Sequence, residues 1–142
     1  MILVDANLLV CASVREMREN ARAVRWLDDR LNAQVRVGLP WESLLAFVRV
    51  ATSRRLFSNP LSLAVAWRQV AGWLGLRNVW TPSPGERHAE VLEGLLAAES
   101  RGSLVHDAHL AAIAIEHGLL LCSADRDFSR FSGLRWENPL EG

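Results

Sequence analysis

The sequence predicts an α/β protein of three layers, in which helices cover both faces of a mainly parallel sheet. Segments of strand character alternate with segments of helical periodicity along the chain. The strand segments are apolar throughout, as in residues 2–4 and 119–122, which is typical of parallel strands that are buried on both faces. Hydrophobic residues make up 50% of the 142 residues, so we expect one domain, residues 1–142, with a core of its own.

The expected elements of the first half are separated by turn residues and by proline. Residues 2–4 form a strand that closes in a turn at residues 5–7, and residues 35–39 form a second strand that Pro40 stops. Between them a helical stripe is predicted from Met17, Ala21, Val24, Leu27 and Leu31. Residues 40–42 open the next helix, whose expected buried stripe is Leu44, Phe47, Val48 and Ala51. A turn at residues 59–60 precedes a further helix through residues 67–74.

The second half continues the alternation. The expected elements are a strand at residues 78–80, a loop at 81–85, a helix from about 86 to 100, a helix from about 103 to 116, a strand at 119–122 and a short strand at 134–137. Gly102 separates the two helices, and His117-Gly118 is typical of a helix C-terminus.

Acidic residues fall at the edge where such sheets bind ligands, beyond the carboxyl ends of the strands. Asp5 ends the first strand, Glu42 begins the helix after the second, and Asp125 follows the apolar strand that ends at Cys122. Asp107 lies in the first turn of its helix and shares a face with apolar residues, which directs it over the core. We therefore expect four carboxylates to converge.

Each acid also has a purely structural alternative. Glu42 and Asp107 would complement the positive ends of their helices, and Asp125 would serve as a turn or cap residue. Asp5 is harder to explain in this way, because a carboxylate directly after Ile-Leu-Val needs compensation if it is buried.

Four converging carboxylates would repel one another unless a cation lay among them. Oxygen ligands suit a hard ion, so the expected cofactor is Mg²⁺ or Mn²⁺. The four histidines, His88, His106, His109 and His117, lack the spacing of a zinc site, and we expect surface or capping roles for them.

Charge and cysteine content exclude several classes of protein. Sixteen basic and sixteen acidic residues give a formal net charge of zero, so no overall positive field indicates a nucleic-acid partner. Cys11 and Cys122 both lie in apolar stretches and are expected to be reduced core thiols. The sequence shows no secretory signal and no membrane-spanning stretch, so a cytoplasmic protein without a membrane partner is expected.

Four sequence contexts occur in the order found in a known family. They are Val4-Asp5-Ala6-Asn7, Glu42 ahead of Leu45 and Arg49, His106-Asp107-Ala108 with Ala111-Ala112, and Ser123-Ala124-Asp125-Arg126-Asp127-Phe128. Together they span nearly the whole chain, which resembles a PIN-domain ribonuclease of the VapC toxin type.

This resemblance implies a fold, a site and an activity. It implies an α/β/α PIN domain whose acidic site is Asp5, Glu42, Asp107 and Asp125, with Asp127 either a fifth metal ligand or a residue that orders the turn. Asn7 and Ser123 match supporting polar positions. The implied reaction is metal-dependent endonucleolytic hydrolysis of RNA, with transfer or ribosomal RNA as plausible substrates. The implied partners are a cognate VapB-type antitoxin and a second copy of the chain in a homodimer.

Arginines are the candidates for contacts with RNA phosphates, since the chain has no lysine. Arg15, Arg18, Arg22 and Arg25 are at helical spacing, and a solvated helix face is the alternative interpretation. Arg126 lies between two predicted site acids, where it would contact RNA or pair with those acids. Arg49, Arg54 and Arg55 are further candidates. Trp67 and Trp73 are predicted to be core, with a dimer or antitoxin contact as the alternative.

Two other functions compete with the nuclease. A phosphohydrolase would use Asp5 as a covalent nucleophile, but Asn7 stands where a second acid would be expected and no lysine is present to bind the phosphate. A non-catalytic PIN-like module that binds RNA or protein has no need of four anions placed together.

Overall fold

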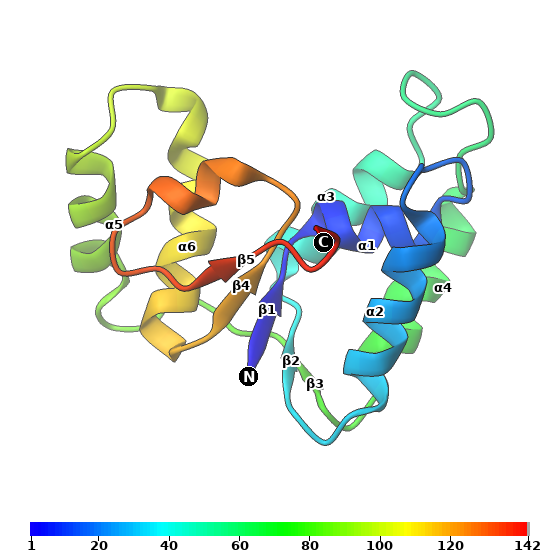
Figure 1. Ribbon diagram of the computed structural model, residues 1–142, viewed down its shortest axis with the longest axis horizontal. Coiled ribbons are helices and arrows are strands. Elements are labelled where there is room, and N and C mark those ends of the chain that lie inside the picture. The colour runs from blue at the N-terminus through cyan, green and yellow to red at the C-terminus, as the bar shows by residue number, and fades with distance from the viewer. Residues whose placement is uncertain (142) are drawn as a thin grey trace.

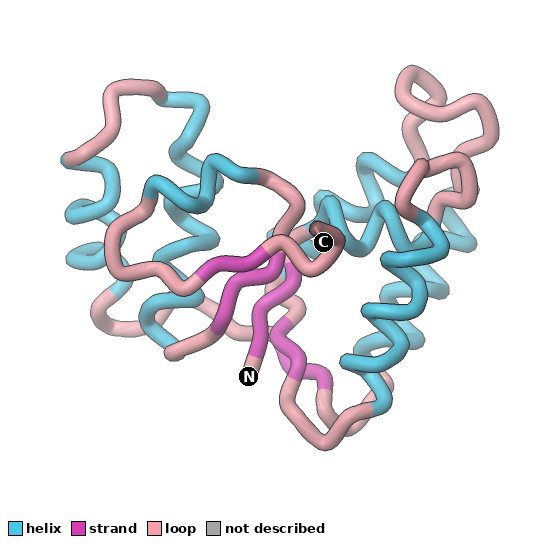
Figure 2. Tube along the Cα trace, viewed as in Figure 1, coloured by secondary structure: helices cyan, strands magenta, loops and turns pink. Residues whose placement is uncertain are grey.

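Five short strands form a single sheet at the centre of the protein in the computed structural model, which describes residues 1–141 (Figures 1 and 2). The strands are β1 (Ile2–Val4), β2 (Val37–Gly38), β3 (Val79–Trp80), β4 (Leu120–Cys122) and β5 (Trp136–Glu137). Their order across the sheet is β3-β2-β1-β4-β5, and every neighbouring pair is parallel. The predicted three-layer α/β fold with a mainly parallel sheet is confirmed. The predicted domain, residues 1–142, extends one residue beyond the described part of the chain.

Helices cover both faces of this sheet (Figure 1). They are α1 (Ala6–Ser13), α2 (Asn20–Asn32), α3 (Trp41–Ala51), α4 (Leu63–Leu74), α5 (His88–Ala97) and α6 (Val105–His117), with 3-10 turns η1 (Gly102–Leu104) and η2 (Arg126–Arg130). Ile2 and Val4 of β1 face the core beneath α1–α4, whereas Leu3 faces the core beneath α5 and α6. Because successive side chains of a strand point to opposite faces, burial on both faces explains the continuous apolar run of β1.

The strand order determines at which edge of the sheet a site can form. The chain moves outward from β1 to β2 and β3, and then crosses to β4 and β5 on the other side of β1. Such a reversal leaves a crevice beyond the carboxyl ends of the two central strands. Asp5 directly follows β1, and Asp125 lies three residues after the end of β4. Across residues 1–141, none of the helices combines the length and the apolar character needed to cross a membrane.

Residues 6–13 correct one prediction. The sequence predicted a turn after β1, but helix α1 begins there, because Asp5 is in an extended conformation and its carboxylate accepts a hydrogen bond from Ala6 N at 2.8 Å. A carboxylate that caps a helix start in this way satisfies one of the free backbone N–H groups. The first acid of the site is therefore also the N-cap of α1.

The predicted arginine stripe is a second correction. Helix α2 begins only at Asn20, so Arg15 and Arg18 lie in the exposed turn between α1 and α2 and share no helical face with Arg22 and Arg25. The physical reason is that α1 ends at Ser13, and the chain must turn before α2 can pack on α1.

The buried residues bear out most of the predicted core. Cys11 and Cys122 are free and buried, and burial, with the nearby charge of Glu137, raises the pKa of the Cys122 thiol to about 12. Trp73 is buried as expected, but Trp67 is 48% exposed and stacks on Trp41 at the surface. Of the predicted stripe of α3, only Val48 is partly exposed.

Candidate functional site

Ser123 connects the carboxyl ends of the two central strands. Its side chain is fully buried, and its Oγ donates a hydrogen bond to Asp5 Oδ2 at 2.7 Å. The same Oγ accepts from Asn7 Nδ2 and from Asp125 N, each at 3.0 Å. The structure thus brings the predicted supporting residues Asn7 and Ser123 into direct contact with Asp5 and with the backbone of Asp125. A buried hydroxyl with three partners fixes the two acids relative to each other.

Three aspartates form a cluster beside Ser123, called the aspartate cluster below: Asp107, Asp125 and Asp127. One carboxylate oxygen from each lies within 4.8 Å of the others, and all three side chains are partly buried. Asp107 comes from the first turn of α6, while Asp125 caps η2 by accepting a hydrogen bond from Asp127 N at 2.9 Å. The cap interpretation of Asp125 is therefore correct, and it coexists with a place in the cluster.

Burial and the charges of neighbouring acids raise the pKa values of Asp107 and Asp5. Burial is the main cause for Asp107, followed by the charges of Asp125, Asp5 and Asp127, and together they raise its pKa from 3.8 to about 6. Burial also raises the pKa of Asp5, against the lowering effect of its hydrogen bonds from Ser123 and Ala6. Carboxylates that are costly to ionise together in this way are typical of a cation-binding or catalytic site.

Glu42 approaches the same region from helix α3. It lies in the first turn of α3, and its Oε2 accepts a hydrogen bond from His109 Nε2 on α6. A cavity of about 500 Å³ lies between these helices, and Asp5, Glu42, Arg49, His106, Asp107 and His109 are among its lining residues. Asp107 therefore belongs both to the cavity and to the aspartate cluster.

Only some of the five predicted acidic ligands lie in the aspartate cluster. Within residues 1–141, Asp107, Asp125 and Asp127 form the cluster, whereas Asp5 and Glu42 are not members of it. The carboxylate of Asp5 is turned toward Ser123 and the start of α1, and that of Glu42 toward His109. Both nevertheless line the cavity that Asp107 also lines.

Carboxylate oxygens are the ligands preferred by Mg²⁺ and Mn²⁺, and the cluster offers three of them close together. The donor set therefore fits a hard divalent cation, with Asp107, Asp125 and Asp127 as the first candidates to hold it.

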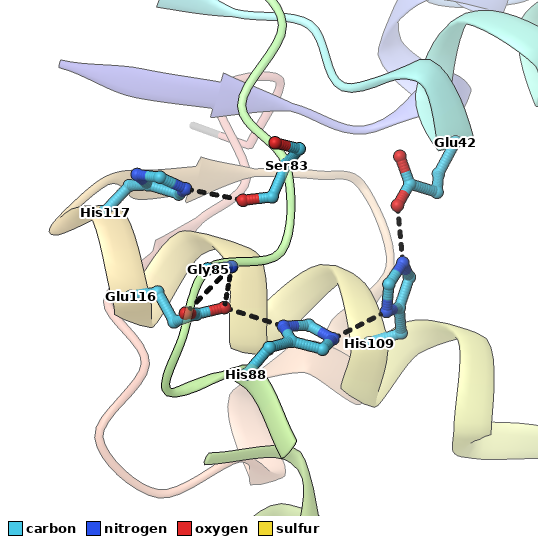
Figure 3. Close-up of polar contacts among 7 residues, drawn as sticks. All are labelled: Glu42, Ser83, Gly85, His88, His109, Glu116 and His117. Carbon is cyan, nitrogen blue, oxygen red and sulfur yellow. Dashed lines mark hydrogen bonds and ion pairs between the residues drawn. The ribbon is translucent and has the colours of Figure 1, made fainter. Parts of the chain in front are cut away.

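The sequence missed a role for two histidines. His109 was expected at the surface or at a helix cap, but it joins Glu42 on one side and His88 on the other, and His88 joins Glu116 (Figure 3). His88 and His109 are 21 residues apart in sequence, so no local spacing marked the pair.

The arginines near the site differ in their partners. Arg126 is 81% exposed, and its Nη2 lies 2.9 Å from Glu141 Oε1 rather than close to a site acid. Arg130 and Arg101 instead flank Asp127, at 3.7 and 3.9 Å, a pairing that the sequence did not predict. Arg49 lines the cavity, and none of the carboxylates in residues 1–141 forms an ion pair with it.

Solved structures share this architecture. The chain of FitAcB from Neisseria gonorrhoeae matches with a TM-score of 0.68 and 21% identity, and the match covers 98% of each chain. A chain of VapBC2 from Rickettsia felis, crystallised with a fragment of promoter DNA, matches with a TM-score of 0.65 and 16% identity, over 97% of this chain and 98% of that one. At these identities the likeness shows the fold.

Sequence comparison shows the family. The PIN domain model matches residues 2–134. Ribonuclease VapC37 of Mycobacterium tuberculosis is 44% identical over 140 residues, which cover 98% of this chain and 97% of that protein. Ribonuclease VapC33 of the same species is 39% identical over 141 residues, or 99% of each. The chain therefore belongs to the PIN-domain family, in the group of the VapC ribonucleases.

Proposed function

We propose that this protein is a metal-dependent endoribonuclease, the toxin of a toxin–antitoxin pair, which hydrolyses RNA phosphodiester bonds at the carboxyl edge of its sheet. The observation that carries the proposal is the aspartate cluster beside the cavity, within a chain whose relatives over nearly full length are named ribonucleases. A cluster of like charges with a raised pKa at Asp107 gains most from a bound cation.

Asp107, Asp125 and Asp127 would hold a Mg²⁺ or Mn²⁺ ion, with Asp5 and Glu42 completing the acidic site from the cavity side. When bound, such an ion supplies positive charge to the phosphate oxygens and makes a nearby water easier to deprotonate. Asp5 holds its position through Ser123, and Glu42 is directed by His109. The carboxylate of Glu42 would orient the attacking water, and that of Asp5 would supply fixed negative charge, so the chain needs no nucleophile of its own.

The geometry of Asp5 argues against the competing phosphohydrolase. A covalent nucleophile needs a free carboxylate oxygen that can reach the phosphorus atom. Both oxygens of Asp5 already accept hydrogen bonds, Oδ1 from Ala6 N at 2.8 Å and Oδ2 from Ser123 Oγ at 2.7 Å. Asp5 is therefore better suited to a fixed structural and electrostatic role.

The names of the relatives support an RNA substrate for this chain. We propose transfer or ribosomal RNA as the substrate class, with Arg126, Arg15 and Arg18 as phosphate contacts and Arg49 as a further one inside the cavity. The matching chain belongs to the VapBC2 structure bound to a DNA fragment from its promoter, and we propose a VapB-type antitoxin for this chain, with a homodimer as its own assembly. The proposed place of action is the cytoplasm.

The test is cleavage of end-labelled small RNA by the purified protein with Mg²⁺ or Mn²⁺, in parallel with excess EDTA. We expect discrete products that need the metal and that disappear with Asp5→Asn. Asparagine is as good an N-cap as aspartate, so this variant should keep helix α1 and remain folded, while its amide nitrogen cannot accept the hydrogen bond from Ser123 Oγ. Asp28→Asn, which removes an exposed carboxylate of α2, is the matched control and should cleave normally.

Cleavage that survives EDTA, or that Asp5→Asn leaves intact, would contradict the proposal. If the protein binds Mn²⁺ and RNA without cutting any RNA, the non-catalytic binding module is the better description.

A further inference from the structure

Four side chains form a continuous line of polar contacts that runs from the cavity toward the packed helices α5 and α6 (Figure 3). Glu42 accepts a hydrogen bond from His109 Nε2, and His109 Nδ1 lies 2.9 Å from His88 Nε2. His88 Nδ1 lies 2.7 Å from Glu116 Oε1. These four residues are called the imidazole chain below.

Helix geometry explains why the imidazole chain can form. His109 and Glu116 are seven residues apart on α6, which is about two helical turns, so both project from the same face. His88 is the first residue of α5, and its ring lies between them. Two side chains of one helix are thus bridged by a residue of its neighbour.

Burial increases steadily along the imidazole chain. The exposed fraction of the side chain is 38% for Glu42, 26% for His109, 13% for His88 and 6% for Glu116. Glu116 also accepts hydrogen bonds from Gly85 N, at 3.1 and 3.3 Å from its two oxygens. A nearly buried carboxylate needs such partners, and with them the inner end of the imidazole chain is fixed while Glu42 remains accessible from the cavity.

The hydrogens of the imidazole chain can be counted. Three contacts join the four groups, and each needs one hydrogen. Two neutral imidazoles supply only one ring hydrogen each. All three contacts are hydrogen bonds when the four groups share one hydrogen more than the two neutral rings supply.

We propose that His109, His88 and Glu116 are positioning residues, which hold the carboxylate of Glu42 in the cavity beside the aspartate cluster. This inference rests on the proposed function, because it assigns His88 and Glu116 to the metal site through Glu42. Glu42 is on the exposed start of α3 and its side chain has three rotatable bonds, so without His109 it would sample several orientations. A hydrogen-bonded support of this kind orients the ligands of many metal sites.

The competing explanation is that these residues only hold a loop. Glu116 binds Gly85 N, and the neighbouring His117 binds the carbonyl of Ser83 through Nε2 at 2.8 Å, so both attach the same loop to α6. His117 does not belong to the imidazole chain, and His117→Phe would keep an aromatic ring beside Trp80. It is therefore the matched control for His88→Phe.

The experiment measures Mn²⁺ affinity by electron paramagnetic resonance for wild type, His88→Phe and His117→Phe, each with and without Glu42→Gln. We expect His88→Phe to weaken Mn²⁺ binding by about tenfold or more, the usual effect of losing a ligand's hydrogen-bonded support. His117→Phe should stay near the wild-type value. With Glu42→Gln already present, His88→Phe should cause little further loss of Mn²⁺ affinity, because the residue that His88 helps to position has been changed.

A second measurement does not depend on metal. Long-range proton–nitrogen NMR spectra of the His109 ring should show a protected Nε2–H in the wild type, lost in His88→Phe and kept in His117→Phe. An unchanged His109 signal in His88→Phe, or a loss of affinity that persists fully with Glu42→Gln, would overturn the inference. Wild-type protein that binds no Mn²⁺ and cuts no RNA would overturn the proposed function instead, and the assignment to a metal site with it, even if the His109 signal showed the imidazole chain intact.

Gly85→Ala tests the inner end without removing any side chain of the imidazole chain. A Cβ at Gly85 would lie 2.8 Å from Glu116 Oε2, so the carboxylate must move away, which a flexible side chain allows with little strain on the fold. We expect weaker Mn²⁺ binding in the same direction as for His88→Phe at an unchanged melting temperature. Wild-type affinity, with a crystal structure that shows Glu116 displaced from His88, would overturn the role of Glu116.

Discussion

Two groups of acidic side chains lie at the same edge of the sheet, and they differ in what compensates their charge. Asp107, Asp125 and Asp127 face one another within 4.8 Å, and burial together with their mutual repulsion raises the pKa of Asp107 to about 6. Glu42 stands apart from them, and its carboxylate is hydrogen-bonded to His109, which the rest of the imidazole chain supports.

The difference indicates a division of tasks. Among residues 1–141, the ion pairs to the aspartate cluster come from Arg101 and Arg130, both at 3.7 Å or more from Asp127, so much of its charge remains available to an ion. Glu42 already has a partner from the protein itself, His109, which limits its orientation. Loss of an aspartate should therefore affect metal binding more than loss of Glu42.

Asp107→Asn should have the largest effect. Removing a ligand charge at the point shared by the cavity and the cluster should reduce cleavage by about a thousandfold, or about 4 kcal/mol of activation free energy. Glu42→Gln should reduce cleavage by only about ten- to a hundredfold, in the range of residues that support or orient ligands. Single-turnover cleavage at saturating Mn²⁺ measures both.

Melting temperatures provide the control for these two variants, since both should remain folded. A larger loss of cleavage for Glu42→Gln than for Asp107→Asn would reverse the comparison and make Glu42 the principal acid.

The residues that the sequence predicted at the site are those with a local signal. Asp5 and Asp125 each follow an apolar strand, and parallel strands bring such residues to one edge whatever the details of packing. Both residues form a hydrogen bond with Ser123 because β1 pairs with β4. A parallel pairing of this kind is consistent with the sheet that the sequence predicted. The positions of Asp5 and Asp125 at the site thus follow from where the two strands end.

The features that the sequence missed depend on contacts between distant segments. His88 and His109 meet because α5 packs on α6, and neither residue has neighbours in sequence that indicate a partner. Helix α1 was missed for a different reason, since Asp5-Ala6-Asn7 interrupts the apolar run between β1 and residues 8–10 and was interpreted as a turn. The only local signal for its start was the capping residue Asp5.

The raised pKa of Asp107 predicts that the free energy of unfolding of the metal-free protein depends on pH, an effect of intermediate size among these predictions. An acid whose pKa is higher in the folded state is protonated first in that state, so folding is penalised above pH 6 and the penalty falls as the pH is lowered from 6 toward 4. Asp107→Asn removes the charge at every pH. In EDTA, the variant should therefore exceed the wild type in free energy of unfolding at pH 7.5, and the difference should shrink at pH 5.

Metal binding should show the opposite trend. Because an ion needs the ionised carboxylate, Mn²⁺ affinity of the wild type should fall as the pH drops below about 6. Urea denaturation and Mn²⁺ titration at the same pH values measure the two trends together. A stability difference that is the same at pH 7.5 and pH 5 would show that burial and the neighbouring charges do not raise the pKa of Asp107.

The smallest expected effect concerns Arg49, on the Glu42 side of the cavity. Arg49 lines the cavity without an ion pair to any carboxylate of residues 1–141, whereas Arg126 is paired with Glu141. A guanidinium that contacts phosphate contributes about 0.7 to the slope of log affinity against log salt for single-stranded RNA. With Asp5→Asn present to prevent cleavage, Arg49→Gln should lower this slope by that amount, and Arg126→Gln should lower it less. A greater reduction for Arg126→Gln would mean that the RNA backbone passes over η2 on the aspartate side rather than along α3.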